Sequence, residues 1–427
     1  MSTTTATSTT AAAATAAPAP TTSLNVLIIG SGIAGPVLAM TLLRLGHTVT
    51  IYERGVSGGD SYRGAWITFQ ANGMDALRAI DASGTIEEIG YVLDTISFVN
   101  GAGKSLGAMP MAAPREDGTK SRIMRRSDLF VALAREAASR GARVEYEKEL
   151  VDATTLPDGR VKAVFKDGTS AIGDLLVGAD GIHSRVRTLI DPDAQKPRYV
   201  PVLNTGGYIP NFPLHTAPET MTMQFGTRCF FGWCATPDGG AVWFANPPLA
   251  DEPARGILSS KSDADWRAWL HELHDGDAGP AGALIDAAVG PLSGWATYDL
   301  PAVRKWHNGA MVIIGDAAHA TSPSSGQGAS MAIEDAVILG KCLRDCPSTR
   351  SALDTFVSLR KERVEKIVAY GARSANSKAA GPVARVFRDL LLPWVFWYAA
   401  RDGGKGMQWL QGYHIDWDDK VVPVESG

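Results

Sequence analysis

Two kinds of hydrophobic pattern divide the 427-residue chain. Short, mostly apolar runs at Leu24–Ile29 and Met311–Ile314 contain several β-branched residues and predict buried strands of a parallel sheet. After each run, apolar residues recur at helical spacing, from Val37 to Leu43 and again from about Ala329. Strands that alternate with helices in this way predict an α/β domain built on a parallel sheet.

The segment between residues 200 and 300 follows the second pattern. Its apolar residues include many aromatic side chains and alternate with polar ones, at Thr222–Phe225, Cys229–Cys234 and Ala241–Ala245. That alternation predicts antiparallel strands. After Cys346 the spacing is mostly helical. We therefore expect a parallel α/β domain, an antiparallel-sheet domain and a C-terminal helical segment.

Composition limits the class of protein. The chain is 45% hydrophobic and 20% charged, as globular proteins are. Its net charge of −4 and the lack of a basic face give no support for a nucleic-acid partner. Four cysteines in so long a chain, with no CxxC pair, indicate structural thiols of a reducing compartment rather than a disulfide framework.

Residues 1–23 are uncharged and rich in Thr, Ala and Pro, so we expect a disordered tail that cannot offset its ordering entropy. This tail has neither the arginines of a transit peptide nor the apolar core of a signal peptide. The late apolar run Leu390–Ala400 is shorter than the ~18 residues of a membrane span and contains Pro393. We therefore expect a cytoplasmic protein without a transmembrane segment.

A glycine motif, Gly30-Ser31-Gly32-Ile33-Ala34-Gly35, links the first strand run to its helix. Gly30 allows the tight turn, Gly32 lets a pyrophosphate approach the backbone, and Gly35 lets the helix pack on the strand. The next strand, Thr48–Tyr52, ends at Glu53, where a carboxylate can accept hydrogen bonds from both hydroxyls of an adenosine ribose. This unit predicts a dinucleotide site but does not distinguish FAD from NAD.

Two more strand runs end in glycine and a carboxylate. The run Leu175–Gly178 leads into Ala179-Asp180-Gly181, and a later run leads into Gly315-Asp316. In open α/β sheets, ligands bind at the carboxyl ends of the strands. After Asp316 a glycine-rich loop precedes a helix, whose free N–H groups and positive dipole end would face that loop. Taken alone, this last segment fits a nucleotide site and an ordinary β–α turn equally well.

The second and third motifs are long: residues 178–187 read GADGIHSRVR, and residues 315–330 read GDAAHATSPSSGQGAS. With these motifs, residues 24–380 resemble the single-component flavin monooxygenases, a group typified by para-hydroxybenzoate hydroxylase, tetracycline-modifying monooxygenases and salicylate hydroxylases. Two departures blur the subfamily: Ala310 ends a segment that usually reads Trp-x-x-Gly-Arg, and Ser330 stands where many relatives have Asn.

The resemblance implies an α/β fold, with an FAD-binding Rossmann-like domain, an interleaved antiparallel-sheet substrate domain and a C-terminal helical segment. It places a disordered tail at 1–23, the FAD-binding domain at 24–75, 118–190 and 300–345, the substrate domain at 76–117 and 191–299, and the helical segment at 346–427. A monomer or a homodimer is expected.

The resemblance also implies roles for individual residues. Asp316 would bind a ribityl hydroxyl, and Asp180 and Arg185 belong to a motif associated with FAD and nicotinamide binding. Gly328 and Ala329 would present backbone N–H groups to the pyrimidine edge of the flavin, where reduced flavin carries negative charge. The residues expected to contact FAD are Gly30, Gly32, Ala34, Gly35, Glu53, Arg54, Arg63, Ala65, Arg126, Asp180, Arg185, Asp316, Gly328 and Ala329.

The implied chemistry is that of the cofactor: NAD(P)H reduces FAD, O2 adds at flavin C4a, and the hydroperoxide transfers one oxygen to substrate. The substrate would be a small aromatic, polyketide or terpenoid-type compound that is hydroxylated or epoxidised. Two alternatives use the same scaffold: a non-oxygenating FAD oxidoreductase, such as a reductase or halogenase, and a flavin-binding redox-sensing protein without turnover. The Trp-x-Trp-x-Ile-Pro signature of halogenating relatives does not occur in the sequence.

No catalytic side chain can be assigned from the sequence, and no metal site is expected. Pro323 would lie in the loop on the flavin face, with substrate held between that loop and the antiparallel sheet. The candidate pocket walls are Trp66, Phe231, Trp233 and Trp243, although plain sheet core explains each of them better.

Several other residues fit structural roles better than functional ones. His319 is expected to pack or to form a structural hydrogen bond. The segment His271-Glu272-Leu273-His274 lacks the HExxH spacing and is expected on a solvent-exposed helix. The tryptophans of the C-terminal segment are expected to pack across the back of the two domains rather than to touch a membrane or a partner. They are Trp394, Trp397, Trp409 and Trp417.

Overall fold

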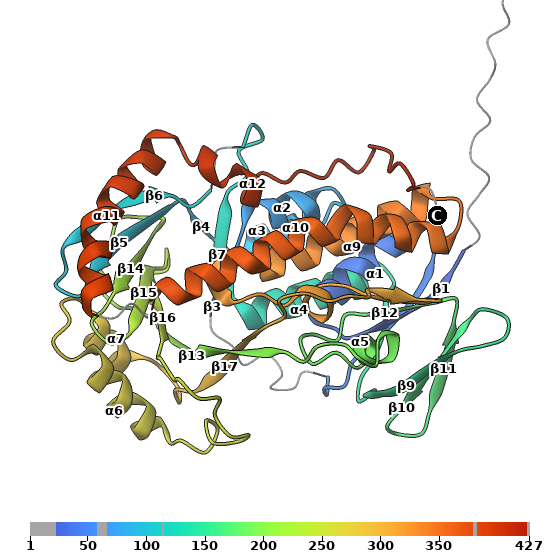
Figure 1. Cartoon of the computed structure of the whole chain (residues 1–427), viewed down its shortest axis with the longest axis horizontal. Coiled ribbons are helices and arrows are strands. Elements are labelled where there is room, and N and C mark those ends of the chain that lie inside the picture. The colour runs from blue at the N-terminus through green and yellow to red at the C-terminus, as the bar shows by residue number, and fades with distance from the viewer. Residues whose placement is uncertain (1–22, 58–65, 113–114, 379–381, 425–427) are drawn as a thin grey trace, which may run out of the picture.

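A six-stranded, largely parallel sheet carries the glycine motifs at its strand ends (Figure 1). The computed structural model describes residues 23–57, 66–112, 115–378 and 382–424. In sheet order the strands are β18 (His307–Asn308), β19 (Met311–Ile313), β12 (Leu175–Gly178), β1 (Asn25–Ile29), β2 (Thr48–Tyr52) and β8 (Arg143–Glu145). Only the edge pair β18–β19 is antiparallel, so the other strands end at the same edge of the sheet.

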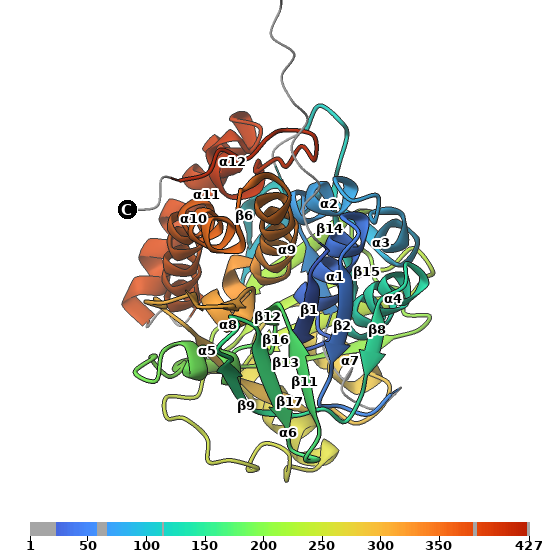
Figure 2. The ribbon, with the colours of Figure 1, turned by 90° about the vertical axis from the view of Figure 1, so that its right-hand side faces the viewer.

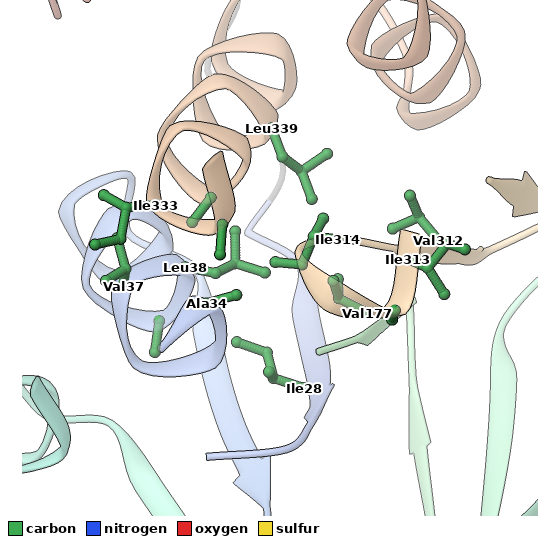
Figure 3. Close-up of a cluster of buried hydrophobic side chains, with 14 of the residues drawn as sticks. Ile28, Ala34, Val37, Leu38, Val177, Val312, Ile313, Ile314, Ile333 and Leu339 are labelled. Atoms are coloured by element: carbon green, nitrogen blue, oxygen red, sulfur yellow. The ribbon is translucent and has the colours of Figure 1, made fainter. Parts of the chain in front are cut away.

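Both faces of this sheet are covered, which explains why its strands are apolar on both sides. Helices α1 (Ala34–Arg44) and α9 (Gly328–Asp345) pack on one face and on each other. Figure 3 shows Leu38 of α1 and Leu339 of α9 in one buried cluster with Ile28 and Ile314. Figure 2 shows the opposite face covered by a small antiparallel sheet. Its strands are β9 (Leu150–Thr155), β10 (Val161–Phe165) and β11 (Ser170–Gly173).

A seven-stranded sheet forms the second layer of the molecule. In sheet order its strands are β17 (Gly294–Asp299), β13 (Arg198–Ile209), β16 (Ala241–Asn246), β15 (Phe230–Ala235), β14 (Thr220–Phe225), β5 (Thr95–Asn100) and β6 (Ser105–Pro110). All neighbours are antiparallel except β14 and β5, which are parallel. Alternate side chains therefore point to opposite faces, as the sequence pattern predicted.

The two faces of the seven-stranded sheet have different neighbours. On one face, Phe231 and Trp243 pack with Trp266 and Leu284 of two short helices, α6 (Asp263–His274) and α7 (Ala281–Ala287). On the other face, side chains meet a three-stranded sheet of β3 (Trp66–Phe69), β7 (Ser121–Arg125) and β4 (Tyr91–Leu93). We call these the outer face and the inner face of the sheet. The inner face is the one that packs against this three-stranded sheet.

The remaining helices connect and cover these sheets. They are α2 (Ala71–Arg78), α3 (Gly84–Ile89), α4 (Arg126–Ser139), α5 (Arg185–Ile190), α8 (Asp316–His319), η2 (Pro323–Ser325), α10 (Thr349–Lys378), α11 (Pro382–Arg401), η3 (Lys405–Met407) and α12 (Gln408–Gln411). Helix α10 runs along most of the molecule in Figure 1 and ends near the seven-stranded sheet, beside α11. Among the described residues, no helix has the length and apolarity that crossing a bilayer requires.

From α12 onward the chain runs back along α9 and α10, and we call residues 409–424 the C-terminal belt (Figure 1). Arg363 of α10 donates to the Trp409 carbonyl oxygen at 2.9 Å, and Arg344 of α9 donates to the Trp417 carbonyl oxygen. The Trp417 ring also lies 5.0 Å from the Arg44 guanidinium of α1. The belt thereby contacts α1 as well as α9 and α10.

The predicted fold class is confirmed, and the first strand, its helix and the third-motif helix lie where the pattern placed them. The sequence also predicts one strand over residues 143–150 and a helix after Arg126 that Ser127 or Asp128 caps, and both of these local predictions are wrong. The stretch 143–150 is not one strand, because Glu147 adopts a φ of +59° and breaks it between β8 and β9. Neither Ser127 nor Asp128 caps α4; Arg125 occupies the N-cap without a side-chain hydrogen bond. The domain boundaries stay a prediction.

Two tryptophans and one histidine lie elsewhere than expected. The side chains of Trp394 and Trp397 are 72% and 53% exposed, so the prediction that they pack on the protein is wrong. Trp409 and Trp417 do pack against the main core. His274 is buried against Phe231 on the outer face, because α6 packs on the sheet there and is not a solvent-exposed helix on that side.

Candidate functional site

The three glycine motifs meet at the carboxyl ends of β1, β12 and β19. Gly30 has a φ of +106°, and a Cβ there would lie 2.4 Å from the Ala179 carbonyl oxygen. Gly315 has a φ of +60°, and its missing Cβ would lie 3.4 Å from the Ala34 Cβ. Only glycine combines these φ values with such close approach. The first motif therefore touches both the second and the third.

Glu53 is fixed beside the first glycine turn. Its Oε2 accepts a hydrogen bond from the Ser31 N–H at 2.8 Å, and its Oε1 accepts one from the Gly55 N–H at 2.8 Å. Each carboxylate oxygen can accept more than one hydrogen bond. The orientation that these two donors impose leaves Glu53 able to accept hydroxyl groups of a ribose as well.

The first motif has the open space and the free hydrogen-bonding groups that a bound dinucleotide requires. A Cβ at Gly32 would meet no atom within 4 Å, so the backbone there borders open space. The Ser31 Oγ is buried and has no hydrogen-bond partner among the described residues. Helix α1 begins at Ala34 without a side-chain cap or an acidic residue in its first turn. Free N–H groups, an unpaired hydroxyl and open space suit a pyrophosphate.

Asp180 has a structural role within its own motif. Its Oδ1 accepts from the Ser184 hydroxyl at 2.6 Å, and its Oδ2 accepts from the N–H groups of Arg185 and Val186 at 2.7 and 3.1 Å. Burial raises the pKa of Asp180 above its ordinary value, although these hydrogen bonds act in the opposite direction. Asp180 therefore holds the start of α5 beside the Gly30 turn.

Arg187 joins the second motif to the third, a role that the sequence did not reveal. Its buried guanidinium donates to the Ile182 carbonyl oxygen at 2.8 Å and to the Ala317 carbonyl oxygen at 3.0 Å. The predicted neighbour Arg185 is exposed and donates to the Val151 carbonyl oxygen of β9. The sequence singles out Arg187 only through its position in the second motif, in the first turn of α5. Its contacts can be seen only in the folded structure.

The third motif places a carboxylate next to a helix start. Asp316, the first residue of α8, is partly exposed, and its Oδ1 lies 3.9 Å from the position that a Gly328 Cβ would take. Helix α9 begins at Gly328 without a side-chain cap or an acidic residue in its first turn, and Ala329 follows. The Gln327 Nε2 is buried without a hydrogen-bond partner among the described residues. Free donors and one carboxylate suit a ribityl chain and the edge of a flavin ring.

A buried ionic network holds the start of α9 and the Gly315 turn in place. Asp335 of α9 accepts from the Gly315 N–H at 2.9 Å and from the Arg360 Nε at 2.8 Å, and Arg360 also pairs with Glu334 at 2.7 Å. All three side chains are fully buried. Burial alone would raise the pKa of Asp335, but His319 and Arg360 hold it at about 2. The charges therefore fix Gly315 and, through it, the position of Asp316.

The network extends to the loop before α9. The Asn72 Nδ2 donates to the Glu334 Oε1 at 2.6 Å and to the Gln327 Oε1 at 2.9 Å. The His319 Nε2 lies 2.5 Å from the Asp335 Oδ2, and the His319 side chain is buried beside Trp306. This geometry fits the structural hydrogen bond expected for His319. Helix α2, the η2 loop and α9 are thereby held as one unit.

Trp66 of β3 packs against the inner face of the seven-stranded sheet, in an aromatic wall. Its ring centroid is 6.1 Å from that of Tyr91 and 5.8 Å from that of Tyr208, and the Arg125 guanidinium lies 4.3 Å from the Tyr208 ring. Both phenols donate to Asp238 Oδ2 at 3.3 Å. Flat rings with a few polar groups are what a pocket for a planar ligand requires.

The other three predicted pocket walls lie on the outer face, in the core that the sheet forms with α6 and α7. Phe231 stacks on Trp243 at 5.3 Å, and Trp233 is buried next to them. Trp233 also borders a cavity of about 520 Å³ lined by residues 212–217, which is on the side of the sheet away from the glycine motifs. Phe231, Trp233 and Trp243 therefore pack as core residues. Phe244, which follows Trp243 in the chain, lies on the inner face and packs in the same cluster as Trp66.

The remaining predicted contacts are distributed around the site. Pro323 begins η2 and is exposed, and Arg54 and Arg126 are exposed beside β2 and at the start of α4. The Arg126 guanidinium lies 5.1 Å from the Phe130 ring. Arg63 and Ala65 lie outside the described residues. Within the described part of the chain, no group of His, Cys, Asp and Glu side chains is arranged to hold a metal ion.

The geometry agrees with what comparisons with known proteins find. The family model described as FAD binding domain matches residues 23–370. Aurachin C monooxygenase/isomerase of Stigmatella aurantiaca is 30% identical, over 82% of this chain and 88% of its own length. The 6-hydroxynicotinate 3-monooxygenase of Pseudomonas fluorescens is 30% identical over 81% of this chain and 89% of its own. Among solved structures, Klebsiella pneumoniae HpxO complexed with FAD and uric acid has a TM-score of 0.78 at 22% identity, covering 89% of this chain and 96% of that one.

Proposed function

Because the chain belongs to the FAD-dependent monooxygenases that share this FAD-binding domain, we propose that it oxidises a small organic substrate with NAD(P)H and O2. The substrate class is a small aromatic, polyketide or terpenoid-type compound, hydroxylated or epoxidised at one position. One observation carries the proposal: the Gly30, Ala179 and Gly315 turns converge at one sheet edge and leave open space bordered by free N–H groups.

Bound FAD would supply the redox chemistry, since it can accept electrons from a nicotinamide and pass them to O2. The protein would bind and orient it. Glu53 would accept the ribose hydroxyls, and the N–H groups at the start of α1 would face the pyrophosphate. Asp316 would accept a ribityl hydroxyl. The N–H groups of Gly328 and Ala329, at the positive end of α9, would stabilise negative charge on the flavin edge without a cationic side chain.

The inner face of the seven-stranded sheet would hold the substrate. Trp66, Tyr91 and Tyr208 offer ring surface, and Arg125 offers a cation beside them. Such a wall would orient a planar molecule and displace water from the reacting face. Two relatives support an aromatic ring as substrate by their names, 6-hydroxynicotinate 3-monooxygenase and 3-amino-4-hydroxybenzoate 2-monooxygenase of Streptomyces platensis. The cytoplasmic location and the monomeric or homodimeric state stay predictions.

The test begins with the purified chain reconstituted with FAD. Candidate compounds are screened for faster NADH or NADPH oxidation, and each active compound is then incubated under isotopically labelled O2. We expect one labelled oxygen atom in the product. Product formation that requires halide, or that contains no label, would support the non-oxygenating alternative instead.

A matched pair of variants tests the site. Asp316→Ala should lower FAD affinity about tenfold or more, since it removes a charged hydrogen-bond acceptor next to the ribityl chain. Asp193→Ala changes a carboxylate that follows α5, is 88% exposed and pairs only with the exposed Arg304 at 3.9 Å among the described residues, and this variant should bind FAD as the wild type does. Full flavin occupancy and activity in Asp316→Ala would contradict the assignment.

A further inference from the structure

Helix α11 has an exposed apolar face. Eight large hydrophobic side chains of this single helix are 53–72% exposed. They are Val386, Phe387, Leu390, Leu391, Trp394, Val395, Trp397 and Tyr398. Four are aromatic, and each aromatic side chain carries about 150–250 Å² of surface. The patch therefore exceeds the few hundred Å² that monomeric proteins usually leave in one place.

The opposite face of α11 is firmly docked, so the exposure is not that of a detached helix. The Phe396 ring is buried and stacks on Phe98 of β5 at 4.2 Å. It sits over Gly107 of β6, where a Cβ would lie only 2.8 Å from the Phe396 Cβ. Asp389 accepts from the Asn100 Nδ2 at 3.0 Å. These contacts fix which side of the helix faces outward.

The charges around the apolar face are mainly positive. Between residues 385 and 405 there are four basic residues and two acidic ones, although the whole chain has a net charge of −4. Asp389 points inward, and Asp402 is engaged by the Gly406 N–H at 2.6 Å. Arg401 and Lys405 are exposed at the C-terminal end of the helix, with the Arg401 guanidinium 4.6 Å from the Trp397 ring.

We propose that α11 is a membrane-surface helix that inserts its apolar face into the headgroup region of an anionic bilayer. Trp and Tyr side chains are favoured at that depth, and Arg401 and Lys405 would meet lipid phosphates. A second copy of the chain fits less well, because Asp389 and Asp402, the two carboxylates among the described residues 385–405, already accept hydrogen bonds within the chain and are poorly placed to meet Arg401 and Lys405 of a partner. Figure 1 shows α11 at one end of the molecule, so a bilayer could contact this helix there.

Membrane binding through α11 would place the seven-stranded sheet beside the lipid. Phe396 and Phe98 join α11 to the inner face of that sheet, which also carries Tyr208, and Trp66 of β3 packs against Tyr208 there. A bound membrane would therefore lie next to the elements that we expect to receive the substrate, and not next to the adenosine end of the FAD site.

The test is co-sedimentation of the full, FAD-loaded chain with phosphatidylcholine vesicles, with and without phosphatidylserine. We expect binding that is stronger with phosphatidylserine and falls with added salt. The double variant Trp394→Ser/Tyr398→Ser should lower the partition coefficient about tenfold or more on either vesicle. Arg401→Glu/Lys405→Glu should remove mainly the increase that phosphatidylserine causes.

Matched controls separate docking from misfolding. Val289→Ser and Val422→Ser change side chains that are 56% and 81% exposed outside α11, and both should bind vesicles as the wild type does. All variants should keep the wild-type flavin content and melting temperature, since the changed side chains face solvent. Failure of the wild type to bind vesicles would overturn the proposal. So would a concentration-dependent dimer that Trp394→Ser/Tyr398→Ser converts to monomer without any vesicle binding.

Discussion

The parallel sheet and the seven-stranded sheet offer their residues to a ligand in different ways. In the parallel sheet, β1 and β12 are buried along almost their whole length, because helices cover one face and a small sheet covers the other. Only the strand ends are free to bind anything. In the seven-stranded sheet, neighbouring residues such as Trp243 and Phe244 point to opposite faces, one toward α6 and α7 and one toward the site.

The difference separates three kinds of position. Side chains inside the parallel strands, and those on the outer face of the seven-stranded sheet, determine stability. Residues at the parallel strand ends, such as Gly32 and Asp316, should determine cofactor binding. Residues on the inner face, such as Tyr208, should determine substrate binding. Substitutions at neighbouring positions can therefore test the assignment.

The largest expected effect is on the outer face. Trp243→Ala should lower the free energy of unfolding by about 3–5 kcal/mol, because a fully buried indole is removed from close packing. Its neighbour Phe244→Ala should cost less stability, since that ring is only partly buried, and should instead raise the KM for substrate. Urea unfolding and steady-state kinetics of both variants give the answer. If Phe244→Ala lowered stability more and Trp243→Ala raised the KM, the assignment of the inner and outer faces would be wrong.

The next effect distinguishes two glycines of one motif. Gly30→Ala should cost about 2–4 kcal/mol of stability, through a positive φ and the contact with the Ala179 carbonyl oxygen. Gly32→Ala should leave the stability of the FAD-free chain within about 0.5 kcal/mol, because its Cβ meets no protein atom. It should nevertheless weaken FAD binding about tenfold or more by filling the pyrophosphate space. Flavin titration and thermal unfolding separate the two, and tight FAD binding by Gly32→Ala would exclude this placement of the pyrophosphate.

The pH dependence of stability tests the buried ionic network around Asp335, which holds the third motif in place. The pKa of Asp335 is lowered from 3.8 to about 2 in the folded chain, so its ionised form stabilises the fold above about pH 4. That contribution, about 2 kcal/mol, should be lost as the pH falls from about 4 to about 2. The Asp335→Asn variant should lack this part of the pH dependence, whereas the exposed control Asp193→Asn should keep it. Equal acid profiles for the wild type and Asp335→Asn would contradict the network.

The smallest effect is expected on the inner face. Tyr208→Phe removes a hydroxyl that donates to Asp238 and should raise the KM by less than about tenfold, with flavin content unchanged. Tyr199→Phe, whose hydroxyl donates to the Leu249 carbonyl oxygen away from the site, is the control. A change in flavin content rather than KM would place Tyr208 in cofactor binding.

The strand-end residues could be predicted from the sequence because glycine, carboxylate and helix start follow one another within a few residues. Gly30, Glu53 and Asp316 were found in this way, and the structure brings their turns together. The face of the antiparallel sheet could not be predicted. Alternation shows that Phe231 and Phe244 lie on fixed faces, but it carries no information about which face meets the FAD-binding domain.

Contacts between residues far apart in the chain also could not be predicted from the sequence. Asp335 follows Glu334, and Arg360 begins the charged run Arg360-Lys361-Glu362-Arg363. Charged residues in helical patterns are usually solvated, yet the fold buries Arg360 against Asp335, and Asp335 against Gly315. The opposite error concerns Trp394, whose apolar side chain suggested a buried position although α11 turns it outward. In both cases the local pattern predicted the helix correctly, while only the tertiary arrangement decides what its sides contact.

The C-terminal belt has a consequence for how the protein is made. The belt provides the carbonyl oxygens to which Arg344 and Arg363 donate, and Trp417 lies against Arg44 of the first helix. During synthesis on the ribosome, the strands and glycine turns emerge long before these partners do. The elements around the glycine turns therefore reach their final set of contacts only after residues 409–424 have left the ribosome.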